Sequence, residues 1–136
     1  MDKLTPERRS ANMSRIRSRD TSPEMIVRRL VHRMGYRYRL HVASLAGKPD
    51  IVFPRLKKII EVRGCFWHQH AGCIDSHIPK SRRQYWEPKL ERNRCRDQVN
   101  GLELRRLGWK VCVVWECETK VMEKLSSRLK RFLSPK

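Results

Sequence analysis

Acidic residues and long apolar runs are both scarce in this chain of 136 residues. Asp and Glu number 14 against 32 Lys and Arg, so the formal net charge is +18, while 39% of the residues are hydrophobic. A folded protein with this excess of positive charge is expected to bind a polyphosphate, because each neutralised phosphate releases counterions. A basic protein without such a partner, or one that binds acidic membranes, is the alternative.

No apolar run approaches the roughly 20 residues that cross a bilayer, and the polar start Met1-Asp2-Lys3 is not typical of a signal peptide. The five cysteines cannot all pair in disulfides and favour a reducing compartment and metal ligation. Internal repeats and flexible linkers are missing as well. We therefore expect one cytoplasmic, monomeric domain over 1–136, with an N-terminal arm at 1–20 and a core at 21–136.

Cysteine and histidine cluster after Glu61, where Cys65, His70 and Cys73 form a C-x4-H-x2-C array. A tetrahedral zinc site takes four such ligands. The fourth candidate is Cys117, which follows an apolar run typical of a strand and could reach the array if two strands lie side by side. The sequence predicts structural zinc, with ordinary buried thiols as the alternative. His68 is then free for proton transfer near neutral pH, although the opposite assignment, with His70 free, stays open.

The apolar periodicity predicts a mixed α/β order of helices, strands, helix, strand and helix. Strands are expected at 36–40, 50–53, 58–62 and 109–115, and helices at 21–34, 89–107 and 120–133. A short helix or turn at 81–86 is expected to end ahead of Pro88. The apolar residues of the first and last of these helices are Ile26, Leu30, Met34, Val121, Leu125, Leu129, Phe132 and Leu133, and the positions of the middle helix expected to face inward are Leu90, Val99, Leu102 and Leu107.

Met13 and Ile16 are the apolar members of a basic, arginine-rich segment at residues 1–20. That stripe is too thin to anchor a helix in a core, so the pattern predicts an arm laid on another molecule, such as a nucleic-acid backbone. A solvated charged face is the alternative.

Carboxylates are placed for phosphodiester hydrolysis. Asp50 opens one expected strand and Glu61 lies on the next, so the two could share Mg²⁺, a cation that prefers oxygen ligands. Arg63 projects from the same face as Glu61 and could meet the scissile phosphate. The pattern Pro49-Asp50…Glu61-x-Arg63 resembles the core of PD-(D/E)xK nucleases, with Arg where Lys is usual. Glu24, in the first turn of a helix, is either a carboxylate favoured by the helix dipole or a catalytic one.

Phe66 and Trp67 stand inside the metal-ligand array. They could form a core pair, but on a surface loop we favour stacking on bases or wedging between them.

Several short motifs occur in unbroken order along nearly the whole chain. They are Ser10-x-Asn12-Met13-x-x-Ile16, Arg19-Asp20-Thr21, Glu24, Gly47-Lys48-Pro49-Asp50, Gly64-Cys65-Phe66-Trp67-His68, Trp86, Lys89, Asn93, Arg96-Asp97, Leu107-Gly108-Trp109 and Val114-Trp115-Glu116-Cys117. With them the chain resembles the very-short-patch repair (Vsr) DNA mismatch endonucleases, for which Gly-Cys-Phe-Trp-His is a specific signature.

The resemblance implies a restriction-endonuclease-like mixed central sheet flanked by helices. It implies an enzyme of the bacterial nucleoid that nicks DNA 5′ to the thymine of a T·G mismatch, the product of 5-methylcytosine deamination, and so a functional link to a DNA cytosine-5 methyltransferase. Mg²⁺ would be held by Asp50 and the backbone carbonyl of Val62, with Glu61 as a further candidate ligand. His68 would be the catalytic histidine, Glu24 would support that histidine or a metal-bound water, and zinc would take the four ligands named above. The residues implied to contact DNA are Met13, Ile16, Phe66, Trp67, Trp86, Lys89, Asn93 and Arg96.

Three positions depart from the best-known member of that family, which has threonine at Val62, a second active-site histidine at Arg63 and an apolar residue at Glu61. Arg63 exchanges a titratable group for a permanent cation, so nuclease chemistry is a firmer expectation than mismatch specificity. The alternatives are a restriction-like or structure-specific endonuclease without T·G preference, and a non-catalytic zinc-stabilised DNA-binding module. Binding alone requires none of Asp50, Glu24 and His68, which argues against the module.

Overall fold

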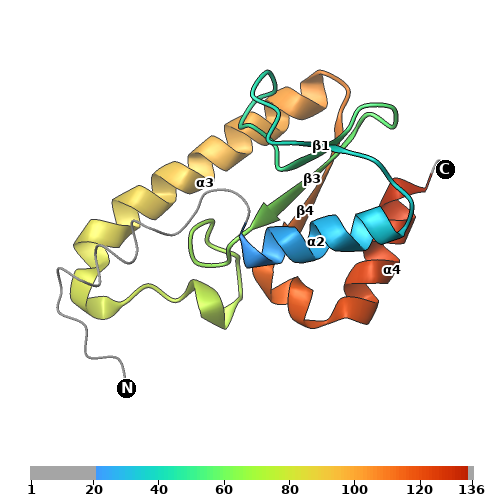
Figure 1. The fold of residues 1–136 in the computed structure, drawn as a ribbon. Helices are drawn as coiled ribbons and strands as arrows, with labels where there is room; N and C mark the ends of the chain where they lie inside the picture. The colour runs from blue at the N-terminus through green and yellow to red at the C-terminus, as the bar shows by residue number, and fades with distance from the viewer. Residues whose placement is uncertain (1–20, 135–136) are drawn as a thin grey trace.

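The computed structural model describes residues 21–134 (Figure 1). The predicted arm at 1–20, with Met13 and Ile16, lies outside the described residues, and the division into arm and core stays a prediction. The elements in chain order are α2 (Ser22–Arg33), β1 (Arg39–Leu40), β2 (Ile51–Phe53), β3 (Lys58–Arg63), the 3-10 helices η1 (Ile74–Ser76) and η2 (Lys80–Arg82), α3 (Arg83–Arg106), β4 (Lys110–Trp115), the 3-10 helix η3 (Glu116–Lys120) and α4 (Met122–Leu133). None of the helices within 21–134 is both long and apolar enough to cross a bilayer.

A mixed sheet with strand order β1-β2-β3-β4 confirms the predicted fold class. The β2–β3 pair is the expected antiparallel hairpin, with Ile51 opposite Ile60, whereas β3 and β4 run parallel, with Arg63 opposite Trp115. Because parallel strands end at the same edge of a sheet, the segments that follow β3 and β4 emerge side by side. This is what brings the loop after Arg63 next to η3.

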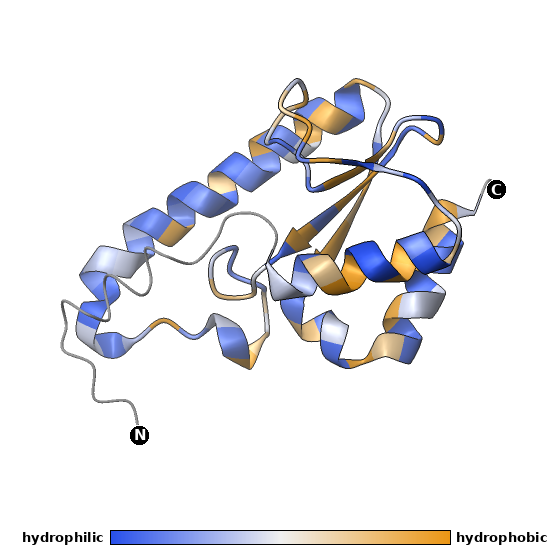
Figure 2. Ribbon diagram, viewed as in Figure 1, coloured by the Kyte–Doolittle hydropathy of each residue, from blue (hydrophilic) through white to orange (hydrophobic). Residues whose placement is uncertain are grey.

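Helices cover both faces of the sheet (Figure 1). On one face, α2 and α4 pack against the strands through buried residues that include Val27, Val31, Leu125 and Leu129. On the other, Leu104 near the end of α3 packs against Val52 and Ile59. Figure 2 shows the same division, with apolar strands in the middle and an α3 that is hydrophilic over most of its length.

The inward face of α2 differs from the one predicted. The helix begins where the sequence indicates, since the Thr21 hydroxyl accepts a hydrogen bond from the Glu24 N–H at 3.3 Å. However, its buried residues are Glu24, Val27 and Val31, while Ile26, Leu30 and Met34 are half-buried, and of these Leu30 and Met34 pack against the core as predicted. The buried stripe of α2 therefore starts with a carboxylate.

The predictions for α3 were wrong in two respects. Pro88 lies inside a continuous helix, where burial of Trp86 and Leu90, at about 1.5–3 kcal/mol per large side chain, offsets the lost hydrogen bond. Val99 and Leu102 are 64% and 67% exposed, and Leu107 is exposed as well. The middle of α3 has no apolar surface opposite it, because it faces the polar cleft described next.

Candidate functional site

A cleft of about 600 Å³ opens beside the sheet, where β2 begins and β3 ends. It gathers predicted and unpredicted polar residues in one place. Its ionisable lining residues are His41, Lys48, Asp50, Glu61, Arg63, His68 and Asp97.

Asp50 occupies the floor of this cleft, directly before β2. Its Oδ2 accepts a hydrogen bond from the Val62 N–H at 2.8 Å, which fixes the carboxylate across the hairpin. Burial, together with the nearby carboxylates of Glu24 and Glu61, raises the pKa of Asp50 to about 7, although the hydrogen bond from Val62 opposes the shift. Crowded, desolvated carboxylates of this kind are typical of functional sites that receive a cation.

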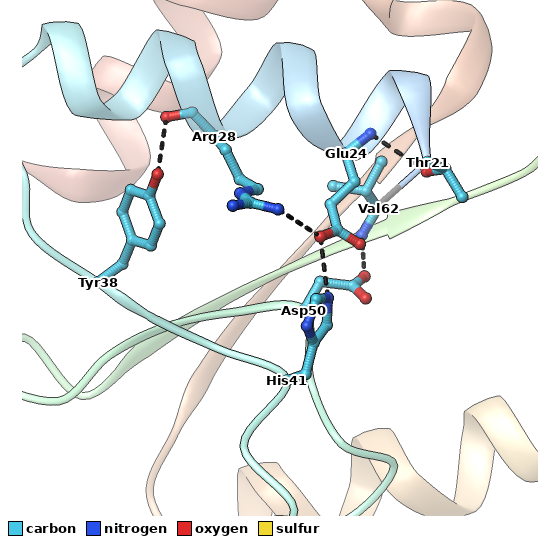
Figure 3. Close-up of polar contacts among 7 residues, drawn as sticks. All are labelled: Thr21, Glu24, Arg28, Tyr38, His41, Asp50 and Val62. Carbon is cyan, nitrogen blue, oxygen red and sulfur yellow. Dashed lines mark hydrogen bonds and ion pairs between the residues drawn. The ribbon is translucent and has the colours of Figure 1, made fainter. Parts of the chain in front are cut away.

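Glu24 reaches Asp50 from α2 and is only 2% exposed. Its Oε2 lies 2.9 Å from His41 Nε2 and 3.5 Å from Arg28 Nη1 (Figure 3). The ligand atoms of Glu24, His41 and Asp50 all lie within 4.8 Å of one another, so these side chains could share one ion. Two carboxylates suit Mg²⁺, and a position facing Asp50 from the inside of α2 favours the catalytic interpretation of Glu24 over the helix-dipole one.

Glu61 does not join that group. Its Oε2 accepts a hydrogen bond from Arg63 Nη2 at 2.7 Å, because residues two apart on a strand project from the same face. The Arg63 guanidinium also lies 5.9 Å from the centre of the Trp115 ring. Arg63 is thus a paired cation rather than a free one, and the role of Glu61 as a further Mg²⁺ ligand stays a prediction. Coordination by the Val62 carbonyl stays a prediction.

His68 faces the cleft with its orientation fixed. Its Nδ1 lies 2.6 Å from Asp97 Oδ2, on α3. An imidazole held at one ring nitrogen by a carboxylate has a defined tautomer and leaves Nε2 for proton transfer. Asp97 was not predicted as a site residue. The sequence pattern that could have indicated Asp97 is its helical spacing, because it lies four residues after Asn93. The Asn93 side chain contacts the loop that carries His68 and donates a hydrogen bond to the Trp67 carbonyl at 3.1 Å.

If the chain nicks DNA, as the resemblance implies, Asp97→Asn should lower the nicking rate by about 10–100-fold, because the asparagine no longer stabilises a charged imidazole or fixes its tautomer. Single-turnover nicking of an intact duplex, measured across a range of pH, tests this, and thermal unfolding of the variant checks that it is folded. Glu91→Gln, which removes an exposed carboxylate from the same helix, is the matched control and should leave the rate unchanged. Equal rates for Asp97→Asn and wild type would contradict a role for the pair.

The four predicted zinc ligands, Cys65, His70, Cys73 and Cys117, lie together with all ligand atoms within 4.8 Å. His70 Nδ1 is 3.7 Å from Cys65 Sγ and 3.5 Å from Cys117 Sγ. Ligands of a tetrahedral zinc ion, at bond lengths of about 2.3 Å to sulfur and 2.0–2.1 Å to nitrogen, are separated by roughly 3.6 Å. The group therefore fits zinc, although the identity of the ion stays a prediction.

A single residue separates the two histidines. Gln69 has φ +50°, the left-handed region, which turns the chain between His68 and His70. Its side-chain amide donates to the Phe66 carbonyl at 2.7 Å and to the Ser76 carbonyl at 3.1 Å. His70 accordingly faces the cysteines and His68 faces Asp97, which is the first of the two assignments considered from the sequence.

An aromatic cluster lies beside this loop. The rings of Phe66, Trp67 and Trp86 contact one another edge to face, with centroids 5.2–5.5 Å apart. Lys89 Nζ lies 5.6 Å from the Trp67 ring centre and 5.9 Å from that of Trp86. Phe66 and Trp67 are half-buried, but Trp86 is only 6% exposed. Trp86 therefore supports the other two rings, and a wedge would be formed by Phe66 and Trp67. Arg96 is exposed on α3.

If the chain has the mismatch-nicking activity that the resemblance implies, Trp67→Ala should lower it by roughly 5–150-fold, the equivalent of a base–aromatic stack worth about 1–3 kcal/mol. Metal content and non-specific DNA binding should stay close to wild type. Trp109→Ala, which removes a half-buried tryptophan from the second core cluster, is the control for lost stability and should not change the ratio of T·G to T·A cleavage. Unfolding of Trp67→Ala would show that the ring is part of the core.

A mixed sheet with carboxylates at its edge and an imidazole held by a carboxylate is the arrangement expected of a nuclease. A family model, DNA mismatch endonuclease Vsr, matches residues 1–73. The type II nicking enzyme V.XorIIP of Xanthomonas oryzae pv. oryzae is 50% identical over 134 residues, 98% of either chain. DNA mismatch endonuclease Vsr of Escherichia coli is 39% identical over 125 residues, 92% of this chain and 78% of that protein.

The chain therefore belongs to the Vsr family of DNA mismatch endonucleases. It is an endodeoxyribonuclease whose substrate is DNA, and the family implies a divalent metal.

Proposed function

We propose that this protein nicks one strand of duplex DNA 5′ to the thymine of a T·G mismatch, in a Mg²⁺-dependent reaction, during very-short-patch repair of deaminated 5-methylcytosine. Its functional partner is then the cytosine-5 methyltransferase whose product gives rise to the lesion, and its place is on the bacterial nucleoid. The observation that supports this best is the meeting of Asp50 with the His68–Asp97 pair in a single cleft, with the ligand atom of Glu24 within 4.8 Å of that of Asp50.

The residues of the cleft divide the chemistry between them. Asp50 and Glu24 would hold Mg²⁺, which would supply charge neutralisation at the scissile phosphate. His68 moves a proton through Nε2, and Asp97 stabilises the imidazolium that results. Arg63, balanced by Glu61, adds a cation that does not titrate near neutral pH.

Recognition of the mismatch is assigned to the aromatic cluster. A T·G wobble pair is unstacked more easily than a Watson–Crick pair, so a protein that wedges Phe66 and Trp67 into the stack gains specificity from the deformation. Lys89 lies over these rings, where its ammonium group could also meet the backbone beside the wedge. The predicted N-terminal arm, with Met13 and Ile16, would hold the DNA from the other side.

A second candidate is nicking without T·G preference, as part of a restriction–modification system. It is favoured by the names of relatives, since the Xanthomonas protein and one from Neisseria meningitidis, 42% identical over 132 residues, 97% of this chain and 94% of that protein, are called type II nicking enzymes. Substrate comparison separates the two.

Duplexes that differ in one base pair, T·G or T·A, should be nicked at rates that differ by tenfold or more, because each mismatch contact is worth about 1–3 kcal/mol. The nick should map 5′ to the thymine, require Mg²⁺ and stop with EDTA. Equal cleavage of both duplexes would favour the second candidate. Binding of DNA without any cleavage would favour a non-catalytic module.

A further inference from the structure

His41 lies in the cleft although no sequence motif pointed to it. We propose that His41 is a direct ligand of the catalytic ion, so that the site combines two carboxylates with one imidazole and binds a transition-metal dication such as Mn²⁺ more tightly than Mg²⁺. The inference rests on the proposed function in one respect, because it takes Glu24 and Asp50 as the residues that hold the ion.

The backbone places His41 opposite Asp50. The β1–β2 ladder ends with Leu40 paired to Ile51, and the His41 N–H continues it with a hydrogen bond to the Asp50 carbonyl at 3.1 Å. At His41 the chain adopts φ +45°, a left-handed conformation that L-residues rarely adopt. This turn ends β1 and directs the ring toward α2, and a residue held in a rare conformation at a candidate site is grounds for a functional hypothesis.

The donor atoms already have the spacing of coordination. His41 Nε2 lies 2.9 Å from Glu24 Oε2, and the ligand atoms of His41, Glu24 and Asp50 all lie within 4.8 Å of one another. Adjacent ligands of an octahedral ion, at bond lengths of about 2.0–2.1 Å, are roughly 3 Å apart. Figure 3 shows the His41 ring pointing to the place where the two carboxylates meet, and an ion bound there would replace the hydrogen bond between His41 Nε2 and Glu24 Oε2.

Metal selectivity distinguishes coordination of the ion by the His41 imidazole from a hydrogen bond that only positions Glu24. If His41 only donated a hydrogen bond to Glu24, the ion would meet oxygen ligands alone, which suit Mg²⁺. Imidazole nitrogen instead suits first-row transition dications, for which the affinity of a given site rises along the series from Mn²⁺, better than it suits Mg²⁺. A nitrogen ligand therefore changes the selectivity of the site, whereas a positioning hydrogen bond affects the affinity for both ions alike.

The test uses Mn²⁺ as the probe and full-length protein with its zinc site filled. Pulsed electron paramagnetic resonance of bound Mn²⁺ should show nitrogen modulation in wild type and in His68→Gln, and none in His41→Gln. By calorimetry, His41→Gln should weaken Mn²⁺ binding by about tenfold or more and Mg²⁺ binding by less than about twofold. His32→Gln, an exposed histidine on the last turn of α2, should match wild type in both measurements.

Two results would overturn the inference. One is a wild-type spectrum without nitrogen modulation, or modulation that persists in His41→Gln. The other is a parallel loss of Mn²⁺ and Mg²⁺ affinity in that variant. Asp50→Asn separates this failure from that of the proposed function: if Asp50→Asn binds Mn²⁺ as wild type does, the ion site itself is misplaced, whereas loss of binding there, with an unchanged His41→Gln, refutes only the role of His41.

Discussion

Asp50→Asn should reduce the single-turnover nicking rate by about 10³-fold or more, since charge stabilisation by a bound ion is worth several kcal/mol and about 1.4 kcal/mol is a factor of ten. DNA affinity should stay intact or rise, because a negative charge leaves a surface that faces phosphate. The asparagine carbonyl can still accept the Val62 N–H that Asp50 Oδ2 accepts at 2.8 Å, so the hairpin keeps its register. Rates and binding curves on the same T·G duplex measure both effects.

The matched control is Asp75→Asn, which removes an exposed carboxylate from η1 and should leave the rate as it is. Wild-type activity in Asp50→Asn would place the active site elsewhere. The variant is also expected to carry a signature in pH that a merely structural change would not produce.

That signature follows from the pKa of Asp50, which burial and the neighbouring carboxylates raise from 3.8 to about 7. Below pH 7 the proton competes with the ion, so wild type should need about tenfold more Mg²⁺ for each pH unit. Without metal, the folded state binds the proton more tightly than the unfolded state does, so ionisation destabilises the fold progressively from about pH 4 to 7 and fully above that. Asp50→Asn should therefore melt at a higher temperature than wild type at pH 8, and at a similar temperature near pH 4.

The order of elements along the chain and the pairing of β2 with β3 could be predicted because those residues are buried for their hydrophobicity alone. Ile51, Phe53 and Ile60 lie in one apolar core cluster, as an apolar run bounded by turns indicates. The parallel arrangement of β3 and β4 then brings Cys117 close to Cys65. The fourth ligand chosen for its chemistry is therefore also the one that the sheet topology places beside the other three.

The helices were harder to predict, because one face of α3 is selected for contact with the site rather than for apolarity. Asn93, Asp97 and Asn100 lie at helical spacing on the side that meets the aromatic loop, His68 and the cleft, and Leu104 continues that line into the core. A search for apolar periodicity assigned Val99 and Leu102 to this face and was wrong. A polar stripe between buried anchors such as Trp86 and Leu104 is the pattern that would have revealed it.

His41 was missed for a related reason. A single histidine after a short strand matches no sequence motif. Its place in the candidate ion site depends on Glu24, which lies 17 residues away and faces inward from α2. The inward position of Glu24 also could not be predicted from the apolar residues of α2, since the buried stripe continues through Val27 and Val31 rather than through Ile26 and Leu30. Sites assembled from several elements become visible only when the packing is known.

The largest effect on stability is expected from Cys117→Ser. Structural zinc contributes about 10–16 kcal/mol to the folding of small domains, which equals or exceeds the roughly 5–15 kcal/mol by which a whole domain is stable. Cys117, on η3, is the ligand that links the end of β4 to the loop that carries Cys65, His70 and Cys73. Its loss should reduce zinc from one ion per chain to none and leave the protein unfolded or insoluble, as elemental analysis and circular dichroism would report.

Cys95→Ser is the control, because this thiol is exposed on α3 and lies outside the four-ligand group. It should keep both zinc and the wild-type melting temperature. Burial raises the pKa of the Cys65 thiol to about 12, so at neutral pH a cation must displace the proton before sulfur can bind it. Zinc should therefore be released as the pH falls, and the melting temperature should fall with it, in wild type and in Cys95→Ser alike. A zinc-free protein that melts where wild type does would show that the four side chains are ordinary thiols and an imidazole, and that the loop with Phe66, Trp67 and His68 is held by packing alone.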